Sequence, residues 1–221
     1  NRTFRLTIPT FRSVQGTNKQ FGQDEFFVGE IGQMGTQMDG LGHVGVRLSE
    51  GDTFYNGFKS QDILGPYGLK NLGVENVGVF FTRGVLIDIA DYKGVETLAN
   101  SYEVTLADVR GALKKQGIAE DSIKEGDALF FRYGWARLWG DAEAYNTDPP
   151  GIGMEVGRWV VDSKASMIGS DQWGTEVITT LTEIPVHLEL IPKNGIWNLE
   201  NMRFDDLVAD EVHEFLFVFT P

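Results

Sequence analysis

Four side chains capable of metal binding or proton transfer lie within eleven residues near the start of the chain: Gln33, Gln37, Asp39 and His43. Three glycines lie among them, and we expect these to take positive φ and let the four side chains converge on one point. Each glycine costs about 1 kcal/mol in a helix interior, so the segment is predicted to be a strand that enters a turn-rich loop. The alternative is an ordinary polar turn in which Asp39 and His43 are solvated.

A second group of polar side chains lies late in the chain. Glu200 belongs to the otherwise apolar run Ile196–Asn201. A carboxylate buried alone there would be costly, so Glu200 is expected to have a cation as its partner. His187 lies on a segment predicted to be helical through Leu190. The alternative is that Glu200 shares the solvent face of an alternating strand with Asn198, and that His187 makes a helix-cap contact.

The first motif has a family resemblance. The spacing Gln33-x3-Gln37-x-Asp39-x3-His43, with Gly35-Thr36 inside it, resembles the signature of the cyclase family, the metal-dependent hydrolases related to bacterial kynurenine formamidase and isatin hydrolase. That signature is usually His-x-Gly-Thr-His-x-Asp-x3-His, so glutamine replaces two histidines here. Later segments resemble further family motifs in the same order, namely Pro150–Val156, Met167–Asp171, His187 and Gly195–Asn201.

The resemblance implies a divalent metal site. Its ligands would be Gln33, Gln37, Asp39, His187 and Glu200. Carboxylate and amide oxygens with one imidazole make a harder ligand set than the family norm, so manganese or zinc is expected, and magnesium is a further candidate. His43 would be the proton shuttle, because the last histidine of the motif lies beside the metal in related enzymes. Glu200 would serve in catalysis as well as in metal binding.

Three functions remain open at this point. The first is a metal-dependent hydrolase that cleaves an amide, lactam, lactone or ester bond of a small apolar or aromatic substrate with metal-activated water. The chain has no Gly-x-Ser-x-Gly elbow and no cysteine as a competing nucleophile. The second is a non-hydrolytic binding protein with a decayed metal site, which the two glutamines favour. The third is a metal-dependent lyase or isomerase that uses the ion to stabilise an enolate.

Arg83 and Trp173 are the candidate substrate-binding residues, and their positions in the family pattern recommend them. Trp173, like Trp135 and Trp139, falls just after a predicted strand end, and aromatic side chains at loop mouths suggest an apolar or aromatic ligand. The alternative is that these are ordinary core or interface aromatics.

Composition limits the remaining possibilities. The 221 residues, 42% of them hydrophobic, are predicted to form one domain over residues 1–221, with residues 1–24 as a peripheral N-terminal extension. A net charge of −13 argues against nucleic-acid or membrane partners. No phosphate-binding or dinucleotide-binding glycine motif is present, so no nucleotide cofactor is expected. The first residues lack an apolar signal segment, which favours a cytoplasmic location, although the chain lacks an initiator methionine.

The pattern of elements predicts an α/β fold. Strands are expected at Glu25–Ile31, Val77–Phe81, Val85–Ile89, Ala128–Tyr133, Ser166–Ser170, Ile196–Asn201 and Glu214–Thr220. Helices are expected to begin after Thr105 as N-cap and at Met154. The family resemblance implies a swivelling β/β/α domain with mixed sheets flanked by helices, and a homodimer or higher homo-oligomer is expected.

Overall fold

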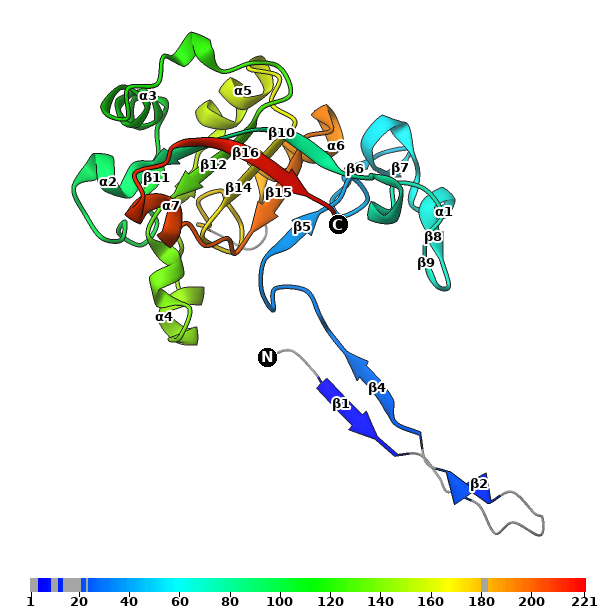
Figure 1. Ribbon diagram of the computed structural model, residues 1–221. Helices are drawn as coiled ribbons and strands as arrows, with labels where there is room; N and C mark the ends of the chain where they lie inside the picture. The colour runs from blue at the N-terminus through cyan, green and yellow to red at the C-terminus, as the bar shows by residue number, and fades with distance from the viewer. Residues whose placement is uncertain (1–3, 9–11, 14–20, 23, 180–182) are drawn as a thin grey trace. The chain divides into compact units, whose positions relative to one another are not determined.

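The computed structural model describes residues 4–8, 12–13, 21–22, 24–179 and 183–221 (Figure 1). The chain divides into two compact units, Asn1–Met34 and Gly35–Pro221. The predicted boundary at residue 24 therefore falls inside the first unit. That unit contains two antiparallel strand pairs: β1 (Phe4–Thr7) with β4 (Phe26–Gly29), and β2 (Arg12–Ser13) with β3 (Phe21–Gly22).

A mixed six-stranded sheet organises the second unit, with the order β16-β10-β12-β14-β15-β5. The four central strands are parallel: β10 (Phe80–Asp88), β12 (Ala128–Arg132), β14 (Met167–Ser170) and β15 (Trp197–Glu200). The two edge strands, β16 (Glu214–Phe219) and β5 (Gln37–Asp39), are antiparallel to their neighbours. A mixed sheet flanked by helices confirms the predicted α/β class (Figure 1).

Strand periodicity divides the apolar side chains between two cores. Successive strand residues point to opposite faces, so Val85 and Ile87 enter one core while Leu86 enters the other. The larger core receives the apolar faces of α3 (Leu106–Lys115), α5 (Met154–Asp162) and α6 (Pro185–Asn194). The smaller core receives aromatic side chains of β16 and the helix α7 (Asp205–Ala209).

Helix α3 begins where its sequence signals predict. The Thr105 hydroxyl accepts the backbone N–H of Asp108, and the Asp108 carboxylate accepts the backbone N–H of Thr105. This reciprocal pair satisfies two donors that would otherwise lack helical partners, and such a cap is typically worth about 1 kcal/mol. Helix α5 also begins at the predicted residue, Met154.

Shorter elements connect the sheet and its helices. The helices are α1 (Ser60–Ile63), α2 (Ile89–Lys93) and α4 (Ala142–Asn146), with 3-10 turns at Tyr55–Gly57, Val74–Asn76, Glu120–Ser122 and Trp135–Leu138. The strand pairs are β6 (Val46–Leu48) with β7 (Gly51–Thr53), β8 (Leu64–Gly65) with β9 (Gly68–Leu69), and β11 (Glu103–Val104) with β13 (Gly151–Ile152). No helix in the described ranges is long and apolar enough to cross a bilayer.

The prediction of separate strands at Val77–Phe81 and Val85–Ile89 is wrong, because β10 is one continuous strand. Its pairing with β16 carries the extended backbone through Thr82, Arg83 and Gly84, the residues between the two predicted strands. Gly84 lies in the middle of this pairing. A Cβ atom at Gly84 would lie 2.5 Å from the ring of Phe215, so glycine here permits close packing and does not mark a turn.

Asp171 follows β14 and is 2% exposed. One of its carboxylate oxygens accepts the backbone N–H of Tyr133 at 2.8 Å, which ties the ends of β14 and β12 together. Burial outweighs the hydrogen bonds from the backbone and raises the pKa of Asp171 to about 6. The charged form is therefore the costly one in the folded protein.

Asp171→Asn should remove a contribution that lowers stability as pH rises. Between pH 4 and 6 the folded state binds more protons at Asp171 than the unfolded state, so this residue lowers stability as pH rises. The free energy of unfolding of the variant, relative to wild type, should therefore increase by roughly 2.5 kcal/mol from pH 4 to pH 7.5. Urea denaturation of both proteins at the two pH values measures this, and a difference that does not change with pH contradicts it.

Candidate metal centre

The pairing of β5 with β15 brings the early motif and the late carboxylate together. Asn198 pairs with Asp39 and Glu200 pairs with Gln37 in antiparallel register. Because side chains alternate along a strand, these four residues share one face, while Met38 and Leu199 enter the smaller core. Glu200 is 1% exposed, so the alternative in which it faces solvent is excluded.

Helix α6 presents His187 to this face. The helix begins at Pro185 without a side-chain cap of its own. The carboxylate of Glu176, on the segment that precedes the helix, caps it by accepting the backbone N–H groups of Val186 and His187 at 3.0 Å each. Negative charge at a helix N-terminus is favourable, which explains how Glu176 is tolerated at 2% exposure. Glu176 also pairs with Nδ1 of His187, so the opposite nitrogen, Nε2, is directed into the cluster.

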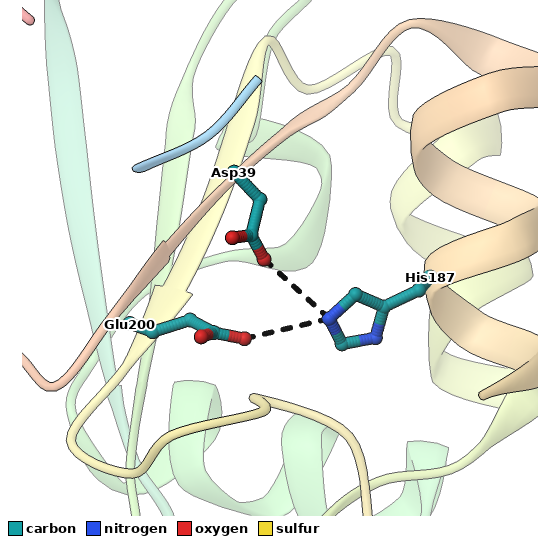
Figure 2. Close-up of side chains that lie close together, drawn as sticks. All are labelled: Asp39, His187 and Glu200. Atoms are coloured by element: carbon teal, nitrogen blue, oxygen red, sulfur yellow. Dashed lines mark ion pairs between the residues drawn. The ribbon is translucent and has the colours of Figure 1, made fainter. Parts of the chain in front are cut away.

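Three candidate ligand atoms converge there (Figure 2). His187 Nε2 lies 3.5 Å from Asp39 Oδ2 and 3.4 Å from Glu200 Oε1. The ligand atoms of the three residues all lie within 4.8 Å of one another, and all three residues are buried. Figure 2 shows that the three side chains come from separate elements and point toward one another.

The side-chain amides of Asn198 and Gln37 donate hydrogen bonds to the carboxylates of Asp39 and Glu200. The Asn198 amide nitrogen donates to Asp39 Oδ2 at 3.1 Å and to Glu200 Oε1 at 3.0 Å. The Gln37 amide nitrogen donates to the other oxygens of the same carboxylates, at 3.0 Å from Glu200 Oε2 and 3.5 Å from Asp39 Oδ1. The amides therefore hold both carboxylates in fixed orientations.

Electrostatics of the cluster favour a cation. Burial lowers the pKa of the His187 imidazole, but hydrogen bonds with Asp39, Glu176 and Glu200 outweigh it and raise that pKa well above its usual value. Burial raises the pKa of Asp39, but hydrogen bonding with His187 and the nearby imidazoles outweigh it and hold that pKa below its usual value. Without a metal, the cluster thus retains a proton on His187 and a negative charge on Asp39.

His43 lies at the exposed side of this cluster. A turn after β5 places it there, with its backbone N–H donating to the carbonyl oxygen of Gly40 at 2.9 Å. Its Nε2 lies 3.5 Å from Asp39 Oδ1, on the opposite oxygen from His187, and 54% of its side chain is exposed. His43 therefore contacts both the buried carboxylate and solvent, as a proton carrier must.

The expected role of the motif glycines is wrong. Gly35, Gly40 and Gly42 do not take positive φ. Two of them instead allow close packing: a Cβ at Gly40 would lie 2.7 Å from the Val74 side chain, and one at Gly42 would lie 2.4 Å from Leu69. Convergence of the motif side chains comes from strand alternation in β5 and from the turn that follows it.

Three predicted site residues remain, namely Gln33, Trp173 and Arg83. Gln33 belongs to the first unit, with φ of 61°, and its role as a ligand stays a prediction. Trp173 is partly buried against the larger core, and its contact with substrate also stays a prediction. Arg83 lies near the start of β10, where its guanidinium pairs with Asp127 and Glu214. The cluster lies at the opposite end of the parallel strands from Arg83, whose ion pairs join strands. The contact of Arg83 with substrate stays a prediction.

Glu176 and Asn198 are the site residues that sequence reasoning missed as functional. The helix start at Ile184-Pro185 lacks a capping side chain, which signals that an acceptor must come from elsewhere, but the sequence does not say from where. Asn198 stands two residues before Glu200 and so shares its strand face. The shared face is therefore a signal in the sequence, but it is equally typical of a strand whose polar face is exposed to solvent.

Comparisons with known proteins agree with the geometry. A family model described as putative cyclase matches residues 3–177, and the chain belongs to the cyclase family. The crystal structure of a novel cyclase is 27% identical, with 96% of this chain and 74% of that chain covered and a TM-score of 0.75. No curated protein matches the chain.

Two more distant structures share the fold. Isatin hydrolase A from Ralstonia solanacearum is 19% identical, with 93% of this chain and 71% of that chain covered and a TM-score of 0.56. A predicted metal-dependent hydrolase from Bacillus stearothermophilus is 14% identical, with 98% and 76% covered and a TM-score of 0.51. The predicted family resemblance is confirmed.

The donor set fits a divalent cation. His187 brings at most one positive charge against the three carboxylates that it contacts, those of Asp39, Glu176 and Glu200. Burying carboxylates is costly unless a cation and hydrogen bonds compensate them. Two carboxylate oxygens and one imidazole nitrogen are also a donor combination that divalent transition metals and zinc accept.

Glu176→Gln should weaken metal binding in a folded protein. The variant keeps an acceptor for the N-terminus of α6 but loses the charge that fixes the His187 ring, and loss of such a partner typically lowers metal affinity by about 10–100-fold. Zinc affinity measured by competition with a chromophoric chelator tests this, with circular dichroism as the control for folding. A folded variant with wild-type affinity would show that Glu176 serves α6 alone.

Proposed function

We propose that this chain is a metal-dependent hydrolase that cleaves an amide, lactam, lactone or ester bond in a small, apolar or aromatic substrate. The observation that carries the proposal is the buried convergence of Asp39, His187 and Glu200 on one point. Membership of a family with hydrolase neighbours adds support.

Asp39, His187 and Glu200 would hold the metal, and Gln33 and Gln37 are further candidate ligands. A bound divalent ion supplies Lewis acidity, which lowers the pKa of water and polarises a carbonyl group. Manganese or zinc suits a site with an imidazole donor better than magnesium does, because magnesium prefers oxygen ligands. Glu200 contributes both as a ligand and as a negative charge beside the reacting group.

His43 moves the proton in this scheme. Hydrolysis joins a water oxygen to the carbonyl carbon, breaks the bond from that carbon to nitrogen or oxygen, and transfers a water proton to the leaving atom. His43 Nε2 takes that proton and returns it to the leaving group. Asp39 Oδ1, at 3.5 Å, stabilises the imidazolium that forms in between.

The isatin hydrolase neighbours suggest a first substrate to try. One of these structures holds the product analogue thioisatinate, and it is 21% identical to this chain with a TM-score of 0.55. A cyclic amide fused to an aromatic ring is therefore the first substrate in a panel of lactams, lactones, aryl amides and esters. The proposal expects hydrolysis of at least one member, abolished by chelation and restored by manganese or zinc.

A non-hydrolytic binding protein with a decayed metal site is the second candidate. The observation that favours it is the amide nitrogen of Gln37, which donates to both carboxylates from a position where the family usually has histidine. A protein that refuses manganese, zinc and magnesium, and hydrolyses no member of the panel, would support this candidate against the hydrolase.

His43→Ala should separate metal binding from turnover. Because His43 is half-exposed and contacts Asp39 on the oxygen away from His187, its removal should leave metal content nearly intact. It should lower kcat by about 10²–10⁴-fold, the usual contribution of a positioned acid–base group. Steady-state kinetics with element analysis measures both, and added imidazole should restore part of the rate. Loss of metal in proportion to activity would make His43 a ligand.

A further inference from the structure

We infer that Asn198 is a fourth metal ligand, through its side-chain carbonyl oxygen, at the site formed by Asp39, His187 and Glu200. The inference rests on the proposed metal-dependent function. Asn198 is 2% exposed, in the middle of β15, and strand alternation directs it to the same face as Glu200. A buried amide among ligand atoms can bind the ion with them or orient them through hydrogen bonds.

The inference rests on the distances among four atoms, one each from Asp39, His187, Asn198 and Glu200. The terminal amide atom of Asn198 lies 3.1 Å from Asp39 Oδ2, 3.0 Å from Glu200 Oε1 and 3.5 Å from His187 Nε2. The imidazole nitrogen lies 3.5 Å and 3.4 Å from the same two oxygens. Donors about 2.1 Å from one ion lie roughly 3.0 Å apart at neighbouring octahedral vertices and 3.4 Å apart at tetrahedral ones. These five separations therefore fall in the range expected of a coordination shell.

Rotation of the Asn198 side-chain amide by half a turn would direct its oxygen, in place of its nitrogen, toward the two carboxylates. The nitrogen now faces the carboxylates, and the oxygen accepts the Thr175 hydroxyl at 2.8 Å. A hydroxyl can accept as well as donate, so Thr175 can receive the turned amide group. Thr175 in turn contacts the Ser170 hydroxyl at 3.0 Å, a second group that can reverse its hydrogen bond. The half-turn exchanges two atoms of similar size in place, so it needs little additional space.

The alternative is that Asn198 only donates hydrogen bonds to the carboxylates and orients them. Removing such an outer partner also lowers metal affinity, typically by about 10–100-fold. Weaker metal binding by an Asn198 variant is therefore required by the inference but does not distinguish the two interpretations. The position of the Asn198 side-chain oxygen in the zinc-loaded protein distinguishes them, and an oxygen beyond bonding distance of zinc would overturn the ligand role.

The experiment measures the affinity of the purified full chain for zinc and for manganese by calorimetry. Asn198→Leu, which keeps the side-chain volume but has no polar atom, should bind zinc at least about tenfold more weakly than wild type. Asn198→Ala serves the same purpose if the leucine variant does not fold. Ser170→Ala is the matched control, because it removes a hydroxyl from the same network and leaves the amide, and its affinity should stay within about threefold.

A crystal structure of the zinc-loaded protein gives the direct answer. The inference expects the Asn198 side-chain oxygen within roughly 2.0–2.2 Å of zinc. Wild-type zinc binding combined with equal or tighter binding by Asn198→Leu would overturn the ligand role while leaving the metal-dependent function intact. A wild-type protein that binds neither metal would overturn both.

Discussion

The structure of the site depends on one constraint: two carboxylates, Asp39 and Glu200, are buried side by side and share an imidazole. Like charges in a low-dielectric interior repel strongly, so this arrangement persists only if its surroundings supply compensating charge and hydrogen bonds. Amide donors from Asn198 and Gln37 supply the hydrogen bonds, and His187 supplies positive charge. A divalent cation would compensate both carboxylates more fully than a single proton does.

The fold supplies the position of every group in the cluster. Strand β5 is added antiparallel to the edge of the parallel strands. This pairing places Asp39 and Glu200, which are 161 residues apart in sequence, on the same face of the sheet. Helix α6 then crosses that face with a N-terminus capped by Glu176, and this one carboxylate fixes both the helix and the orientation of His187. Metal binding and local folding are therefore coupled through Glu176.

Much of this arrangement was predictable from the sequence, for identifiable reasons. The capping signals of Thr105 and Asp108 and the runs of β-branched and aromatic residues in the central strands are local, and they predict the α/β class and most of the elements. Asp39, His187 and Glu200 are predicted from the family resemblance, with the cost of burying a lone carboxylate as a further reason for Glu200, and the structure brings them together. The contacts of Glu176 depend on how the chain folds back between Glu176 and α6, and the position of Arg83 depends on pairing between distant segments; no local pattern contains either.

The central claim is that the cluster binds a divalent metal, and metal stoichiometry tests it most directly. Element analysis of the purified chain, after chelation and readdition of zinc, manganese or magnesium, should find at least one tightly held ion per chain. The folded variant Asp39→Ala, which lacks a carboxylate contacting both imidazoles, should hold none. A wild-type protein that stays metal-free under these conditions, or an Asp39→Ala variant with the full complement of metal, would contradict the account.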